Sequence, residues 1–180
     1  MNEWITDLLA LQDLDMKIRN LKLRIDTIPA EKKRLNSLVK DAMDDVEVAK
    51  DGLRRIERNI KDQEGEAEKL NEASRKLLTQ SAMVKKNNEY QAMMADIEAK
   101  KKAISDIETK ILELLDQAED QQKNVAAAEK ELAVTQKTVK AEMADLVELK
   151  QELEEDIAEK LKLRKAYEGK VDTQTLNVYH

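Results

Sequence analysis

Four basic residues lie in a segment of the chain that contains no acidic residue. They are the only charged residues between positions 73 and 88, namely Arg75, Lys76, Lys85 and Lys86. Because the whole chain has a net charge of -6, the remainder carries -10 once these four cations are set aside. Concentrated positive charge on an otherwise acidic chain is typical of a contact for phosphate groups or for an acidic protein surface. The alternative is that these side chains have no partner and serve only the solubility of the protein at an exposed turn.

Two further residues complete this candidate binding site. Asn87 belongs to the residue types that are frequent at helix starts, and Tyr90 follows one turn later. We expect both to shape the turn or to add polar contacts. No aromatic residue lies inside the basic cluster itself, so stacking of nucleic-acid bases is not indicated.

Several kinds of chemistry are excluded by the residues present. The chain has no cysteine, and its one histidine is the last residue, His180, so disulfides, thiolate or histidine metal sites and a cysteine nucleophile are ruled out. Clustered acids such as Glu154 and Glu155 have no loop that would bring them together around a cation. A two-helix rod is also expected to offer no concave pocket. We therefore expect no enzyme, no catalytic residue and no metal or other cofactor in this chain.

The composition indicates which elements must position the basic cluster. Charged residues make up 39% of the chain and hydrophobic residues 41%, yet there are only four aromatics, three glycines and one proline. This composition disfavours sheet folds and compact α/β enzymes, and it favours long helices. No apolar run reaches the length of a membrane span, and the N-terminus lacks a basic leader region. We expect a cytoplasmic protein that does not contact membranes.

A heptad repeat runs along both halves of the chain. One row of the first half holds Leu11, Ile18, Ile25, Lys32, Val39, Val46, Leu53, Ile60 and Ala67. Its companion row holds Leu14, Leu21, Ile28, Leu35, Ala42, Ala49, Ile56, Gln63 and Leu70. The second half has a fully apolar row from Ile97 to Leu153, whose companion row, from Met93 through Glu142 to Asp156, is apolar at only half its positions. A repeat of 3.5 residues keeps one stripe facing a partner helix, as in a left-handed coiled coil.

The break between the two runs predicts an all-α fold, a long antiparallel two-helix coiled-coil hairpin. The heptad lapses between the runs, where Thr79, Ser81 and Asn87 are poor helix formers or capping types. We predict one hairpin domain over 1–168, with helices at about 3–76 and 88–167 and a turn at about 77–87. Residues 169–180 would begin a linker or short C-terminal helical stub, with Gly169 as the helix stop.

The pairing of the helices is predicted from their stripes. If facing residues have numbers that add to 167, Leu21 lies opposite Leu146 and Ala49 lies opposite Ala118, so that small residues meet small ones. A sum of 160 fits less well. Pro29 interrupts neither row, so it predicts either a bend in a continuous helix or a break with proline at a new first turn.

Two stretches resemble a bacterial family whose members carry a coiled-coil hairpin followed by a C4-type zinc ribbon. From position 84 the chain reads Val-Lys-Lys-Asn-Asn-Glu-Tyr-Gln-Ala-Met-Met-Ala-Asp-Ile-Glu, similar to the family's Lys-Thr-Asn-Lys-Glu-Tyr-Gln-Ala-Leu-Leu-x-Glu-Ile-Glu. From position 8 it reads Leu-Leu-Ala-Leu-Gln-Asp-Leu-Asp, similar to the family's Leu-x-x-Leu-Gln-x-Leu-Asp. Lys86 departs from the pattern, which usually has Thr there, and Asn88 stands where Lys is frequent. The resemblance covers the coiled-coil part alone, so it implies a longer protein and assigns zinc to the ribbon outside this chain.

The resemblance also implies a role. Family members are described as nucleic-acid-binding, and some are linked to the sigma-54 transcription factor and to flagellar or type III secretion. The function this implies is a binding or adaptor module that engages a sigma factor or a secretion component through its tip and flanks. Two alternatives stay open: a transcription regulator whose basic tip contacts RNA or DNA phosphates, weakly for this chain alone, and a structural stalk of a secretion apparatus. Both a monomeric hairpin and a dimer are compatible with the stripes.

Overall fold

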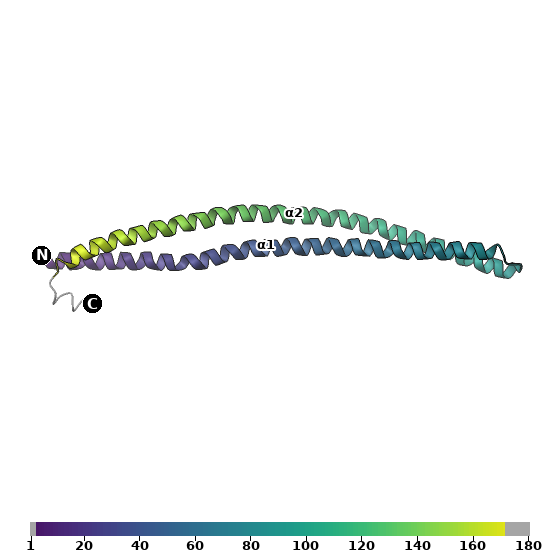
Figure 1. The fold of residues 1–180 in the computed structure, drawn as a ribbon, viewed down its shortest axis with the longest axis horizontal. Helices are drawn as coiled ribbons and strands as arrows, with labels where there is room; N and C mark the ends of the chain where they lie inside the picture. Colours follow the sequence, from purple (N-terminus) through teal and green to yellow (C-terminus); the bar gives the residue numbers. More distant parts are fainter. Residues whose placement is uncertain (1–2, 172–180) are drawn as a thin grey trace. The chain divides into compact units, whose positions relative to one another are not determined.

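The chain folds into two long helices. The structure, a computed structural model, describes residues 3–171. Helix α1 spans Glu3–Ser81 and helix α2 spans Asn87–Glu168, and no strand occurs within 3–171 (Figure 1). The predicted all-α helical hairpin is therefore confirmed. Of the linker or stub predicted at 169–180, residues 172–180 lie outside the described residues.

Two compact units make up the described chain, and both contain a stretch of each helix. Unit 1 combines residues up to 41 with residues from 133 onward, so the start of α1 packs against the end of α2. Unit 2 covers residues 42–132 and includes the turn. Unit 1 joins the two ends of the described sequence, and unit 2 joins the two stretches on either side of the turn, as an antiparallel hairpin requires.

The core of unit 1 is built from the predicted stripes. Its buried centre consists of two α1 residues, Ile28 and Leu35, and two α2 residues, Val139 and Leu146. Partly buried hydrophobic residues pack around them: Val39, Met143, Leu149 and Leu153. All but Met143 occupy positions of the heptad rows, so the periodicity identified this core directly.

Unit 2 contains a polar contact inside its seam. Buried stripe residues lie on both helices, for example Val46, Ile97 and Val125. Between them, Nε2 of Gln121 donates a hydrogen bond to the backbone carbonyl of Ala49, at 2.9 Å. This side chain reaches across the seam because Gly52 has no Cβ to exclude it.

The predicted register is wrong by about one heptad. A sum of 167 places Gln121 opposite Val46, but Gln121 bonds to Ala49, and these two numbers add to 170. The core cluster of Ile28, Leu35, Val139 and Leu146 gives sums from 167 to 181, centred on 174. The cross-helix ion pairs Lys50–Glu129 and Asp15–Arg164 both give 179. A shift of seven brings the same stripes together, so an apolar pattern cannot distinguish these registers. Helix side chains also lean toward the N-terminus of their own helix, which raises the sum for side chains that meet in an antiparallel pair.

Helix α1 continues through Pro29, so the predicted break at that residue is wrong. Polar side chains bridge the proline. The Arg24 guanidinium bonds to the Glu31 carboxylate two turns later, and the Thr27 hydroxyl donates to the Arg24 carbonyl at 2.7 Å. We call Arg24, Thr27 and Glu31 the polar clasp. Because it spans the turn where proline supplies no N–H donor, the clasp holds the weakened helix together.

The predicted turn is too long. Helix α1 extends to Ser81 rather than 76, α2 begins at Asn87, and only residues 82–86 connect them. Thr79 and Ser81 are poor helix formers by residue type, but their hydroxyls donate to helix carbonyls of Arg75 at 3.1 Å and Leu78 at 2.7 Å. Such back-bonding lets both residues remain helical. At the other end α2 stops at Glu168, directly before Gly169, as predicted within one residue.

Replacing Gly65 by Ala is expected to raise the free energy of unfolding by about 0.5–1 kcal/mol, because helical glycine is costly and a Cβ there meets nothing within 4 Å. Gly52→Ala is the matched variant. Its Cβ would lie 2.7 Å from Nε2 of Gln121 and displace that amide, so we expect its gain to be smaller by about 0.5–1.5 kcal/mol, the net value of a hydrogen bond. Urea unfolding followed by circular dichroism measures both, and equal gains would contradict the role given to Gln121.

Candidate binding surface at the turn

The connection between the helices is short and tightly hydrogen-bonded. The Met83 N–H donates to the Gln80 carbonyl at 3.0 Å and the Val84 N–H donates to the Ser81 carbonyl at 3.4 Å. On the α2 side, the Tyr90 N–H donates to the Lys86 carbonyl at 3.1 Å. These bonds continue each helix almost to the middle of the turn. Side chains on the turn are therefore presented from a defined backbone.

All six predicted site residues lie in unit 2, at or beside the turn, and all six are exposed. Two of the four cations have acidic partners: Lys76 pairs with Glu72 at 3.1 Å and Lys86 pairs with Glu89 at 3.4 Å. These exposed pairs are worth little and separate easily. Within residues 3–171, Arg75 and Lys85 form no ion pair. The positive charge of the tip is thus available to a partner.

Asn87 and Tyr90 have different roles at the turn. Asn87 is the first residue of α2, but its side chain is exposed and forms no hydrogen bond with the described residues, so it does not cap the helix. The backbone carbonyl of Lys86 accepts the first bond instead. Glu89 lies in the first turn of α2, where a carboxylate complements the positive end of the helix dipole. Tyr90 is 43% exposed, so its ring and hydroxyl can both contact a partner.

Sequence reasoning missed the apolar part of this surface. Met83 is 78% exposed and Leu78 is 56% exposed, and both flank the basic residues. Neither belongs to a heptad row, which is the signal that could have identified them as side chains outside the seam. We define the tip surface as these two residues together with Arg75, Lys76, Lys85, Lys86 and Tyr90. Its chemistry is apolar and cationic together, which suits an acidic protein surface better than phosphate alone.

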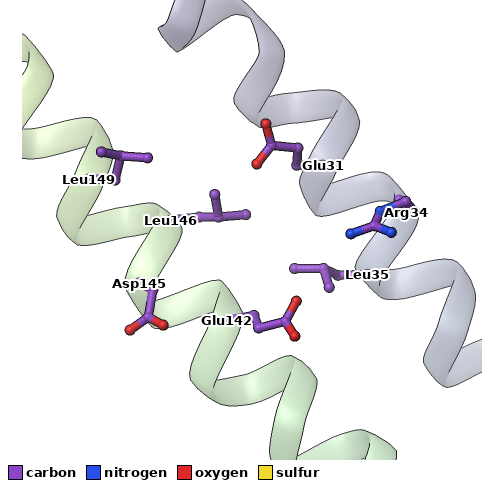
Figure 2. A pocket seen from close by; sticks show the side chains of 7 residues that line it. All are labelled: Glu31, Arg34, Leu35, Glu142, Asp145, Leu146 and Leu149. Atoms are coloured by element: carbon purple, nitrogen blue, oxygen red, sulfur yellow. The ribbon is translucent and has the colours of Figure 1, made fainter.

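Unit 1 contains a groove, although the sequence predicted no concave pocket. It has a volume of about 300 Å³ and is lined by Glu31, Arg34, Leu35, Glu142, Asp145, Leu146 and Leu149. Figure 2 shows Leu35 and Leu146 pointing toward one another from the two helices, with Glu142 extending from α2 toward α1. Glu142 occupies a stripe position that an apolar side chain would normally fill. In the structure Glu142 is exposed at the edge of the groove, and Met143 beside it packs against the core.

The acids of the groove differ in their partners. Hydrogen bonding from Arg24 lowers the pKa of Glu31, and the same bond raises the pKa of Arg24. Glu142 and Asp145 are exposed and form no ion pair within residues 3–171. The groove therefore combines an apolar floor with two uncompensated carboxylates.

Metal-binding and membrane-spanning features are both missing from the described part of the chain. No group of three or more His, Cys, Asp or Glu side chains within it is arranged to hold a metal ion. None of its helices has an apolar stretch that would cross a membrane.

Comparisons with known proteins bear on the fold. No protein-family model matches the chain, and a search of curated proteins finds no significant match. Among solved structures, the 2.12 Å structure of CT398 from Chlamydia trachomatis matches with a TM-score of 0.79 and 22% sequence identity. The match covers 98% of this chain and 75% of the CT398 chain. At this identity the similarity shows the fold alone, the helical hairpin.

Proposed function

We propose that this chain is a non-enzymatic binding module that contacts a protein partner through the tip surface. The observation that carries the proposal is the exposure of Met83 and Leu78 beside four cations. Exposed apolar side chains next to charge are typical of protein contacts, whereas charge alone would serve solubility. The long paired helices support this role by holding the tip on a defined scaffold.

The partner's surface should be acidic with a small apolar patch. Electrostatic attraction toward Arg75 and Lys85 would speed association, and burial of Met83 would slow dissociation. The resemblance at positions 84–98 directs the proposal toward a sigma-54 factor or a flagellar or type III secretion component in the cytoplasm. A contact with RNA or DNA is the second candidate, supported by the four cations alone. The acidic remainder of the chain opposes it, since it repels a polyanion.

The test measures binding of purified sigma-54 factor by calorimetry. Reversing the tip charges (Arg75→Glu, Lys76→Glu, Lys85→Glu and Lys86→Glu) should lower the affinity at least tenfold. The matched control reverses four exposed lysines elsewhere, Lys61, Lys101, Lys130 and Lys137, and should keep the affinity within about twofold.

Four results would count against the proposal or one of its parts. Equal loss in both variants would mean that only net charge matters. No binding of the wild-type chain would exclude sigma-54 as the partner. Tighter binding to a 30-nucleotide single-stranded RNA, with an affinity that falls steeply as salt rises, would favour the nucleic-acid role instead. A function unaffected by tip charge but lost when one heptad is deleted from each helix would favour a stalk.

A further inference from the structure

The groove of unit 1 has the properties of a receptor for a small apolar knob flanked by cations. Its floor is formed by Leu35, Leu146 and Leu149 from facing helices (Figure 2). A volume of about 300 Å³ admits one or two side chains rather than a whole helix. An apolar floor that is partly open to water favours occupation by an apolar side chain.

The charges that line the groove indicate which kind of side chain binds there. Glu142 and Asp145 line the groove without an ion pair in the described chain, while Glu31 is already bonded by Arg24. Arg34 adds one positive charge, so the lining carries three carboxylates and one guanidinium. The groove therefore favours a cationic occupant.

The chain itself carries a segment with the complementary chemistry. Met83 is the most exposed large hydrophobic side chain among the described residues, at 78%, and it lies on the short turn where no helix covers it. Lys85 and Lys86 follow within three residues. Methionine is unbranched and flexible, so it adapts to an irregular apolar cavity. The turn thus offers one apolar side chain, Met83, beside two cations, Lys85 and Lys86. The groove offers an apolar floor beside two carboxylates that form no ion pair, those of Glu142 and Asp145.

We infer that the tip of one copy of this chain docks into the groove of a second copy. Met83 lies on the apolar floor formed by Leu35, Leu146 and Leu149, and Lys85 and Lys86 face Glu142 and Asp145. The inference rests on the proposed function, because both use the tip surface as the contact. It adds that a second copy of the chain is one of the partners. Tip and groove are different surfaces, so the contact is heterologous and propagates to further copies unless it closes into a ring.

The experiment is sedimentation velocity over a range of protein concentrations at about 150 mM salt, where repulsion between distant acidic surfaces is screened. The wild-type chain is expected to sediment faster as its concentration rises, starting from the 20.6 kDa monomer. Reversal of the tip lysines (Lys85→Glu with Lys86→Glu), or of the groove acids (Glu142→Lys with Asp145→Lys), should lower the association constant at least tenfold. Met83→Gln should lower it as well.

Mixing the two charge-reversed proteins is the decisive step. Each supplies the tip or groove that the other lacks, so association should return in the mixture and in the chain that carries all four reversals. Matched controls are Glu113→Lys with Asp116→Lys, which has the same spacing on an exposed face of α2, and Lys101→Glu with Lys102→Glu. Both controls should associate like the wild type, and circular dichroism confirms that every variant remains helical.

The inference is overturned by any of three results. The wild type could stay monomeric throughout, it could associate regardless of the groove reversal, or the mixture could fail to associate. Loss of binding to an unrelated partner in the Lys85/Lys86 variant, with a wild type that stays monomeric, would leave the proposed function in place and remove only the self-docking. Self-association of the wild type without binding of any such partner would support the self-docking and contradict the proposed function.

Discussion

Replacing Leu35 by Ala is expected to lower the free energy of unfolding by about 2–4 kcal/mol. Leu35 is 2% exposed and packs in the centre of unit 1 with Ile28, Val139 and Leu146. The loss combines the transfer free energy of the removed atoms with the cavity that remains. Because Leu35 also lines a groove already open to water, we place the effect below the upper limit for buried leucines. Urea unfolding followed by circular dichroism measures it.

A neighbouring leucine supplies the control. Leu38 lies on the same helix but is 45% exposed, so Leu38→Ala should change stability by no more than about 0.5 kcal/mol. A double-mutant cycle also tests the register. Leu35→Ala should couple with Leu146→Ala, which lies in its cluster, and the coupling with Leu132→Ala, expected for a sum of 167, should be smaller. The opposite ranking would contradict the packing described for unit 1.

Replacing Pro29 by Ala is expected to raise the free energy of unfolding by about 2 kcal/mol. Proline inside a helix costs about 3 kcal/mol, because it removes one N–H donor and its ring crowds the preceding turn. Part of this gain is offset, since alanine gives the unfolded chain more freedom, worth about 0.4–1 kcal/mol. Pro29 is exposed, so its ring contributes little packing that alanine would lose.

The polar clasp provides a second test at the same position. If it compensates for the proline, Arg24→Gln should destabilise the wild-type chain more than the Pro29→Ala chain, where the helix is intact without it. Thermal unfolding of the four proteins in this cycle measures the difference. A Pro29→Ala variant that is less stable than the wild type would show that the pairing of the helices requires proline at this point.

Much of the fold could be predicted from sequence because one signal, the heptad, specifies both the helices and their buried faces. Ile28, Leu35, Val139 and Leu146 all occupy heptad positions, and these four residues form the core of unit 1. The register could not be obtained in this way. The apolar stripes repeat every seven residues, so registers that differ by seven look alike in the sequence. The contact of Gln121 with Ala49 depends on the missing Cβ of Gly52, and a heptad pattern gives no information on such a contact.

The candidate site was predicted in part for a similar reason. Charge counting located Arg75, Lys76, Lys85 and Lys86, since exposed lysines and arginines need no structural context. The apolar half of the tip surface, Leu78 and Met83, depends on which side chains the helices leave uncovered. The groove is lined by residues of both helices, so it becomes visible only when the two helices are placed side by side.

The pair formed by Asp15 and Arg164 has a consequence for how the chain reaches this structure. Their carboxylate and guanidinium groups meet at 2.6 Å, although 149 positions separate them in sequence, whereas Met83 and Gln80 are separated by three. If pairing begins at the turn, each further contact closes only a short additional loop, so the entropic cost is spread over many small steps. Starting from Asp15 and Arg164 would close the largest loop at once. The turn is therefore the expected folding nucleus, and the first residues of α1 are expected to exchange amide hydrogens soonest.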